Sequence, residues 1–141
     1  MPSIFSRIIA REAPGHIVYE DAHAVAFLDI APKAEGHTLV VPRREVAAFH
    51  DLPPEDAQGL VLALQKVARA VTRAMGTAHY NLNLNNGAPA GQVVFHVHFH
   101  IIPRREGVPR SRYPIELSPT RMGQIAAQVR AAVAEGEALF E

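Results

Sequence analysis

The sequence predicts an α+β fold: a five-stranded antiparallel sheet with a long packing helix, a short N-terminal helix and a C-terminal helix. Three observations lead to this fold class. Short apolar segments with alternating residues are joined by short links, which is typical of antiparallel strands. A long amphipathic segment lies between a pair of prolines and a glycine. Three histidines stand two residues apart in an apolar run, which is strand spacing.

The first half of the chain contains the short helix and three strands. The helix is predicted from apolar residues at helical spacing, which are Ile4, Phe5, Ile8 and Ile9, and Pro14-Gly15 follows it. Residues 17–20 and 24–30 are predicted as strands joined by a tight turn near Ala22-His23. A third strand covers residues 37–41 and ends at Pro42.

The second half contains two longer helices and two more strands. Pro53-Pro54 opens the long helix and Gly76 ends it. Residues 80–84 form the fourth strand, and a turn-rich loop over 86–91 leads into a histidine strand that we expect over residues 91–103. Residues 105–141 add a basic loop and a final helix that begins at Ser118-Pro119.

Length and composition limit the classes of function. The 141 residues fit a single domain, and 14 Lys and Arg balance 14 Asp and Glu, which does not favour nucleic acid or a membrane as a partner. The chain has no cysteine, which excludes disulfides and thiolate nucleophiles. The apolar start is interrupted by Ser6 and Arg7, and no apolar run is long enough to span a bilayer. We expect a cytoplasmic protein.

The histidine run is the candidate site. His96, His98 and His100 would form a polar row on one face of their strand, with Phe95, Val97, Phe99 and Ile101 on the other. One histidine in such a segment is more often a satisfied core residue, but three together favour function. Two chemistries fit: a neutral imidazole that attacks phosphorus, or three imidazoles that bind a metal ion.

Five blocks in series resemble the histidine triad (HIT) family, and the match runs from residue 4 to residue 104. The blocks are Asp29-Ile30, residues 36–42 (GHTLVVP), residues 85–87 (NNG), Gly91-Gln92 and residues 96–102 (HVHFHII). The resemblance implies a nucleotide-binding hydrolase or transferase that acts at the α-phosphorus of a nucleotide conjugate, and we expect no cofactor. The alternatives are a non-catalytic nucleotide-binding or scaffold protein that keeps the fold, and a metal-dependent hydrolase with the three histidines as ligands. It also implies a homodimer with a purine nucleotide or its conjugate as ligand.

The family's site residues carry over to matching positions of this sequence. His98 corresponds to the nucleophile, and His100 to a phosphate contact. His96 and His37 correspond to the network that orients the site. Asp29 corresponds to the ribose contact, and Asn85 and Gln92 to polar contacts with the phosphate and leaving group. The apolar slot for the base corresponds to Ile4, Phe5, Ile8, Phe27 and Ile30.

Two positions differ from the family pattern. Many bacterial members carry two cysteines of a zinc site where this sequence has Ser3 and Ser6, and because serine is a poor zinc ligand we expect no metal. At the position of Val93, one branch of the family has a hydroxyl residue that helps to protonate an amine leaving group. Valine cannot donate a proton there. Glu45, which lies outside these blocks, is predicted to be part of a solvated surface.

Overall fold

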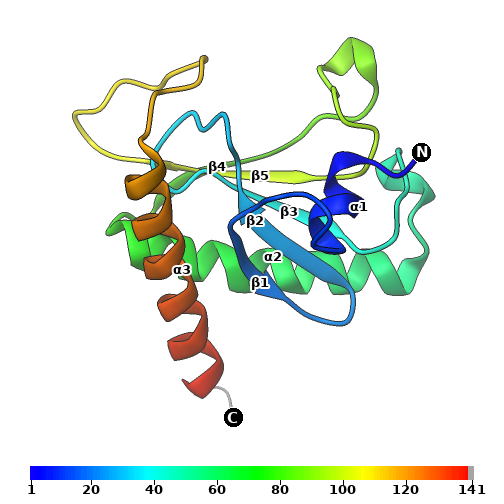
Figure 1. Cartoon of the computed structure of the whole chain (residues 1–141), viewed down its shortest axis with the longest axis horizontal. Helices are drawn as coiled ribbons and strands as arrows, with labels where there is room; N and C mark the ends of the chain where they lie inside the picture. Colours follow the sequence, from blue (N-terminus) through cyan, green and yellow to red (C-terminus); the bar gives the residue numbers. More distant parts are fainter. Residues whose placement is uncertain (140–141) are drawn as a thin grey trace.

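The computed structural model describes residues 1–139 and has the α+β architecture that the sequence predicts (Figure 1). A five-stranded sheet has the order β1-β2-β3-β5-β4, and each neighbouring pair is antiparallel. The strands are β1 (Ile17–Glu20), β2 (Ala24–Leu28), β3 (Thr38–Pro42), β4 (His79–Leu84) and β5 (Phe99–Arg104). The helices are α1 (Ile4–Ile9), α2 (Pro54–Met75) and α3 (Pro119–Leu139), with the 3₁₀ turns η1 (Phe49–Asp51) and η2 (Ala88–Ala90).

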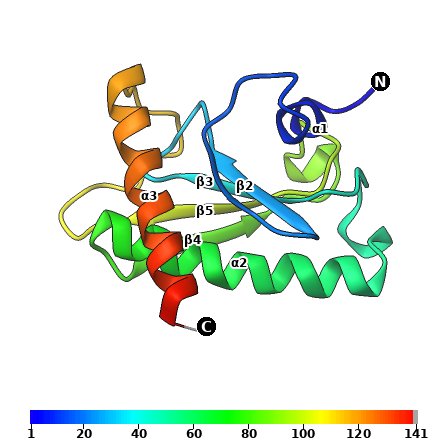
Figure 2. The ribbon, with the colours of Figure 1, turned by 60° about the horizontal axis from the view of Figure 1, so that its bottom comes forward.

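The sheet has apolar cores on both faces. Figure 2 shows α2 lying along one face of the sheet and α3 crossing α2. The larger apolar core fills the space between the sheet and these two helices. Helix α1 lies on the opposite face, where Phe5 and Ile8 pack with Phe27 and Leu39. All five residues of β2 and all five of β3 are buried, because these central strands are covered on both sides.

The ends of the long helices follow the predicted signals. Pro54 is the first residue of α2, where the missing N–H has no helical partner. Gly76 follows the helix with φ +68°, a left-handed conformation that glycine adopts without a steric penalty. At the start of α3, the Ser118 hydroxyl oxygen accepts from the Arg121 amide at 3.0 Å. No helix within residues 1–139 is both long and apolar enough to cross a membrane.

The histidine strand is shorter than predicted. It begins at Phe99 instead of residue 91, so His96 and His98 lie in the irregular segment before it. The Pro42 carbonyl accepts from the His96 ring, and the Val97 amide donates to Val46, outside β3. The ladder with β3 therefore starts only at Phe99. The predicted alternation persists for Val97 and Ile101, which lie in the larger core. Phe95, which was predicted to lie on the same face as these two residues, is 55% exposed, so that prediction was wrong.

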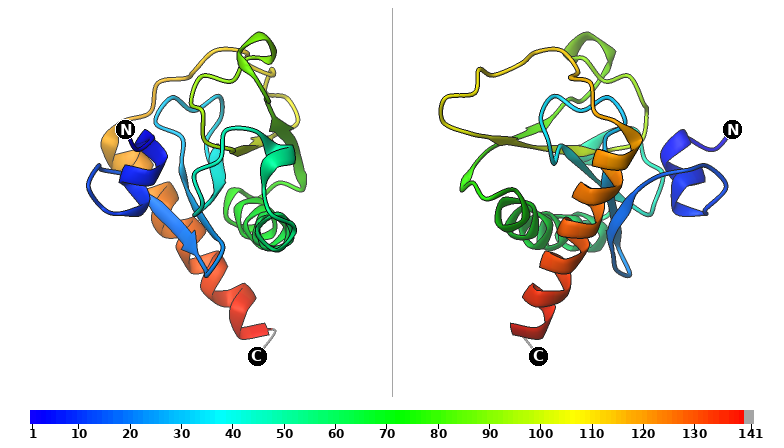
Figure 3. Two further views of the ribbon diagram at one scale, coloured as in Figure 1. Left: turned by 90° about the vertical axis from the view of Figure 1, so that its right-hand side faces the viewer. Right: turned by 60° about the vertical axis from the view of Figure 1, so that its left-hand side comes forward.

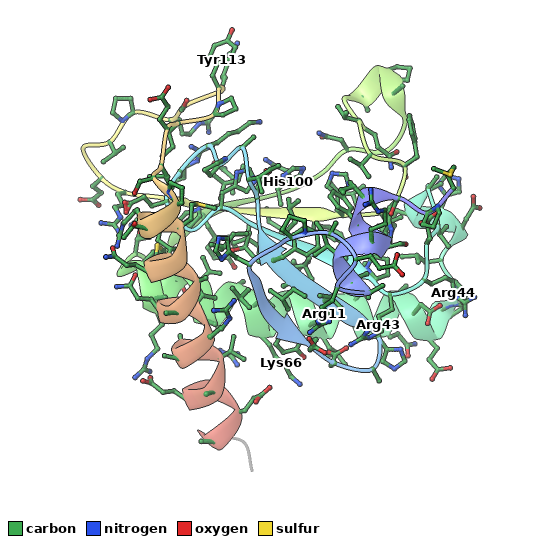
Figure 4. The ribbon with its side chains drawn as sticks, viewed as in Figure 1. Arg11, Arg43, Arg44, Lys66, His100 and Tyr113 are labelled. Carbon is green, nitrogen blue, oxygen red and sulfur yellow. The ribbon has the colours of Figure 1, made fainter. Side chains whose placement is uncertain are left out.

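Two loops rise on the same side of the sheet, at opposite ends of β5, as Figures 1 and 3 show. One carries η2, and the other joins β5 to α3. The second loop is tied to the segment between β2 and β3, since the Ile115 amide donates to the Pro32 carbonyl at 2.7 Å. Arg121 at the start of α3 also pairs with Glu35 of that segment, at 2.6 Å. Figure 4 places His100 below these loops.

Candidate active site

His98 is held at one ring nitrogen and free at the other. Its Nδ1 lies 2.8 Å from the carbonyl oxygen of His96. A carbonyl only accepts, so Nδ1 carries the proton and donates it. The residue is 8% exposed, and no group within residues 1–139 is hydrogen-bonded to its Nε2. In the neutral ring, Nε2 therefore keeps its lone pair, which is the state an imidazole needs to act as a nucleophile.

His96 is buried, and both of its ring nitrogens are used. Its Nε2 lies 2.8 Å from the Pro42 carbonyl oxygen, so Nε2 donates. Its Nδ1 lies 2.7 Å from the Ser3 hydroxyl and accepts from it. Burial lowers the pKa of His96, which keeps the ring neutral. The ring is fixed in one tautomer, and its backbone carbonyl holds His98.

His37 and His100 form a second fixed pair. The Lys33 amide donates to Nδ1 of His37 at 3.0 Å, so the proton of this ring is on Nε2. That Nε2 lies 2.9 Å from Nδ1 of His100, which must then accept. Burial lowers the pKa of both His37 and His100 to about 4, so both are neutral at pH 7. His100 therefore carries its proton on Nε2, where it is available as a donor.

Asp29 lies beside the point where the two rings of this pair meet. One carboxylate oxygen accepts from the Ala31 amide at 2.9 Å, and the other lies 3.4 Å from Nε2 of His37. The negative charge raises the pKa of His37, opposing the larger effect of burial. The side chain is 18% exposed and can still accept from a ligand. The fold thus brings Asp29, which is predicted to contact ribose, close to the hydrogen-bonded pair of His37 and His100.

The five residues predicted to line an apolar slot divide into two groups. Phe5, Ile8 and Phe27 are buried together, with the Phe5 and Phe27 rings 5.3 Å apart. Ile4 and Ile30 are exposed, at 43% and 85%. The Phe5 ring also lies edge-on to His98, at 5.0 Å between ring centres. Helix α1 therefore connects the buried apolar cluster to the triad, while the base contact stays a prediction for all five residues.

The loop around η2 is held from within by Gln92, which is only 5% exposed. Its carbonyl oxygen accepts from the Gly87 amide at 2.7 Å, and its amide nitrogen donates to the carbonyls of Ala47 and Val94. Both N–H groups of its side chain are used inside the protein. Asn85 is half-buried beside Gly91. The predicted phosphate contacts of Asn85 and Gln92 stay predictions, and in this structure Gln92 shapes the loop.

The hydrogen bonds of the triad do not suit a metal ion held by its three histidines. His96 uses both ring nitrogens, and His100 accepts at Nδ1, so only His98 has an uncommitted lone pair. Within residues 1–139, one cluster has suitable ligand spacing: Asp29, His37 and His100, with ligand atoms within 4.8 Å of one another. There the Lys33 amide keeps the proton of His37 on Nε2, and a protonated nitrogen cannot bind a metal ion.

Three polar residues beside the triad were not predicted as parts of the site. Ser3 and Ser6 were considered only as poor zinc ligands, and Glu45 as a solvated surface residue. In the structure Glu45 is exposed, but one of its oxygens accepts from both the Ser3 amide and the Ser6 hydroxyl at 2.6 Å. The sequence separation of about forty residues left no local signal for this contact.

A groove of about 550 Å³ lies elsewhere, between α2 and α3. It is lined by Tyr19, Lys66 and Val133 among others, and it shares no residue with the triad. Figure 4 shows Lys66 on the opposite side of the sheet from His100. The hydrogen-bond chemistry around His98, and not the size of this groove, marks the candidate site.

Comparison with known proteins agrees with this geometry. The model of the HIT domain matches residues 10–107 of the chain. The chain belongs to the HIT family. An uncharacterized HIT-like protein of Methanocaldococcus jannaschii is 47% identical over 104 residues, which are 74% of this chain and 80% of that protein. The matched range, residues 10–107, contains all five sequence blocks that carry the resemblance.

Some relatives have names that state an activity. The adenosine 5'-monophosphoramidase hnt1 of Schizosaccharomyces pombe is 41% identical over 120 residues, covering 82% of this chain and 87% of that protein. The adenylylsulfatase HINT3 of Arabidopsis thaliana is 38% identical over 103 residues, covering 73% of this chain and 52% of that protein. At the level of the family, these names support a nucleotide hydrolase.

A solved structure shares the complete fold. The Zn-bound histidine triad family protein from Mycobacterium smegmatis superposes with a TM-score of 0.86 and 34% sequence identity, over 96% of each chain. Since this identity accompanies nearly full coverage, the arrangement of strands and helices is that of the HIT fold.

Proposed function

We propose that this HIT protein cleaves nucleotide conjugates at the α-phosphorus through a nucleotidyl group bound covalently to His98. The observation that carries the proposal is the free Nε2 of His98, whose Nδ1 proton is held 2.8 Å from the His96 carbonyl. A nucleophilic histidine needs one nitrogen with a lone pair and a second nitrogen that can carry the resulting positive charge. His98 meets both requirements.

In the first step, Nε2 of His98 attacks the α-phosphorus in line with the leaving group. The N–P bond forms, the bond from phosphorus to the leaving group breaks, and the leaving group departs with its electron pair. The ring becomes positively charged, and its Nδ1–H bond to the His96 carbonyl stabilises that charge. The Nε2–H of His100 is the donor that we assign to the phosphoryl group in this step.

In the second step, water attacks the same phosphorus. The new P–O bond forms as the N–P bond breaks, and the electron pair of that bond returns to Nε2 of His98. The nucleoside monophosphate leaves, and the proton lost by water passes to solvent. Covalent catalysis divides one difficult displacement into two easier ones. The fixed tautomers of His96, His37 and His100 mean that these rings need no reorientation between the steps.

For the substrate, we propose a purine nucleotide conjugate with Asp29 as the ribose contact. The exposed Ile4 and Ile30 are the residues we assign to the base, next to the buried Phe5. Val93 is 84% exposed and has no proton to donate to an amine leaving group. We therefore expect leaving groups that depart without protonation, such as sulfate or a phosphate chain, to be cleaved faster than amines.

We also propose a homodimer formed through β4. This strand is at the edge of the sheet, with Tyr80 and Leu82 40% and 46% exposed. An edge strand with exposed apolar side chains and unpaired backbone groups can pair with a copy of itself. A cytoplasmic location, and the absence of nucleic acid or membrane partners, remain predictions from the composition.

A panel of conjugates tests the proposed activity. Purified protein is incubated with adenosine and guanosine phosphoramidates, adenylyl sulfate, an acyl adenylate and a dinucleoside polyphosphate, and release of the monophosphate is measured. We expect release from at least one conjugate, its loss in His98→Asn, and its retention in the control His50→Asn, whose side chain is 75% exposed. Nucleotide binding without release from any conjugate would identify a binding protein instead of an enzyme.

A further inference from the structure

We propose that Glu45 is a positioning residue for the nucleophile, acting through Ser3, Ser6 and His96. Four hydrogen bonds link Glu45 to His98. The Ser3 amide and the Ser6 hydroxyl donate to Oε1 of Glu45, each at 2.6 Å. The Ser3 hydroxyl donates to Nδ1 of His96 at 2.7 Å, and the His96 carbonyl accepts from Nδ1 of His98 at 2.8 Å.

Glu45 selects which hydroxyl binds His96. Nδ1 of His96 has one lone pair and two serines beside it, with Ser3 at 2.7 Å and Ser6 at 3.5 Å. Because Glu45 takes the Ser6 hydroxyl, only Ser3 donates to the ring. Ser3 Oγ also accepts from the Ser6 amide at 3.0 Å, as the N-cap of α1. Each hydroxyl in this network therefore has one acceptor.

The consequence for His98 follows from the burial of His96. Its ring is fully buried, and Nε2 is bonded to Pro42 at the other end. If the Ser3 hydroxyl turns away, a buried nitrogen loses its donor, which is unfavourable, and the ring has to shift or change tautomer. The carbonyl that holds His98 belongs to the same residue. The direction of the His98 lone pair thus depends on an exposed carboxylate of a distant loop.

A comparison of two variants at Glu45 tests the proposal, and its kinetic part rests on the proposed function. Within the described residues 1–139, Oε1 is the Glu45 oxygen that accepts hydrogen bonds, so Glu45→Gln keeps the acceptor, whereas Glu45→Ala removes it. We expect Glu45→Ala to lower kcat about tenfold with KM within about twofold, and Glu45→Gln to stay within about threefold of wild type. Glu12→Ala, which removes an exposed carboxylate after α1, is the matched control.

A second measurement needs no substrate. Long-range ¹H–¹⁵N correlation spectra show which ring nitrogen of His96 is protonated. We expect Nε2–H alone in wild type and Glu45→Gln, and a mixture of tautomers or a weakened Nδ1 hydrogen bond in Glu45→Ala. Folded Glu45→Ala with an unchanged His96 spectrum would overturn the proposal. If the spectra change as expected but no conjugate is cleaved by any variant, the network is as described and the proposed function is wrong.

Should Glu45→Ala fail to fold, Ser3→Ala and Ser3→Thr replace it. Threonine keeps the hydroxyl that donates to His96 and alanine removes it, so kcat and the His96 spectrum should change in Ser3→Ala only. Equal behaviour of these two variants would overturn the proposal.

Discussion

Nε2 of His37 lies 2.9 Å from Nδ1 of His100, and the direction of this hydrogen bond is set by a backbone amide outside the triad. The Lys33 amide can only donate, so the proton of His37 is on Nε2 and the proton of His100 is on the nitrogen that faces the site. A hydrogen bond between two residues four positions apart, Lys33 and His37, thus sets the tautomer of His100, which lies 63 positions after His37.

Because burial lowers the pKa of both His37 and His100, we predict that the protein loses stability in mild acid. In the unfolded chain both histidines titrate near the ordinary pKa of about 6.5, and in the folded protein burial lowers the pKa of each to about 4. Between these values the unfolded state binds protons that the folded state does not, so the free energy of unfolding falls as pH is lowered. The contribution of this pair to the free energy of unfolding is fully present above the pKa of the unfolded chain, about 6.5.

Urea unfolding at pH 7 and pH 5 measures this effect. We expect wild type to lose on the order of 4 kcal/mol more over this interval, about 2 kcal/mol for each histidine, than a His37→Asn/His100→Asn variant, in which neither group titrates. An identical pH dependence for the two proteins would show that the pair does not stay neutral in the fold.

Asp29 is predicted to hold the ribose. Asp29→Ala should weaken ribonucleotide binding by on the order of 1.5 to 3 kcal/mol, as expected for hydrogen bonds to a charged group. The loss should be much smaller for a 2',3'-dideoxy analogue, which lacks both hydroxyls. Calorimetric titration of wild type and variant with both ligands gives the coupling, with Asp51→Ala as a control at a 68% exposed carboxylate. Equal losses for the two ligands would mean that Asp29 supports only His37 and the turn at Ala31.

Turnover should not depend on a bound metal ion. Ser3 and Ser6 are poor zinc ligands, and within residues 1–139 the triad offers only one ring nitrogen with an uncommitted lone pair, Nε2 of His98. After exhaustive chelation we expect turnover to stay within about twofold of the untreated protein. One equivalent of zinc per chain, with activity lost on its removal and restored on its return, would assign the histidines to a metal site.

The proposed dimer is tested by a charge on the edge strand. Leu82→Lys places an ammonium group on the exposed side of β4, where like charges of two copies would meet. We expect wild type to sediment as a dimer and Leu82→Lys as a monomer. Leu62→Lys on α2, at a site that is 59% exposed and lines the groove beside α3, should remain dimeric. A monomeric wild type at micromolar concentration would contradict the assignment.

The features predicted most accurately are those with local signals. Pro54 and Gly76 mark both ends of α2, Ser118 caps α3, and alternation locates the five strands. The predicted start of β5 was wrong because it depends on a backbone carbonyl far away in the sequence. The Pro42 carbonyl accepts a hydrogen bond from the His96 ring instead of from a strand amide. Periodicity shows which residues share a face, but it does not show where backbone pairing begins.

The candidate site shows the same division. His96, His98 and His100 could be chosen from their spacing, whereas His37 and Asp29 were chosen only through the resemblance to the HIT family. The role proposed for Glu45 and the internal bonds of Gln92 could not be predicted, since both depend on contacts between residues 39 to 45 positions apart in the sequence. Exposed carboxylates and loop amides are common, and only the folded geometry shows which of them contact the triad network or hold the loop around η2.

The central claim, nucleophilic attack by His98, is tested most directly by acid-free rapid quench of a reacting sample followed by peptide mass spectrometry. We predict a nucleoside monophosphate adduct on the peptide that contains His98, formed within one turnover. We also predict that folded His98→Asn loses at least about a thousandfold in kcat while its nucleotide affinity stays within about tenfold. Wild-type-like turnover by the folded His98→Asn protein would contradict the covalent mechanism.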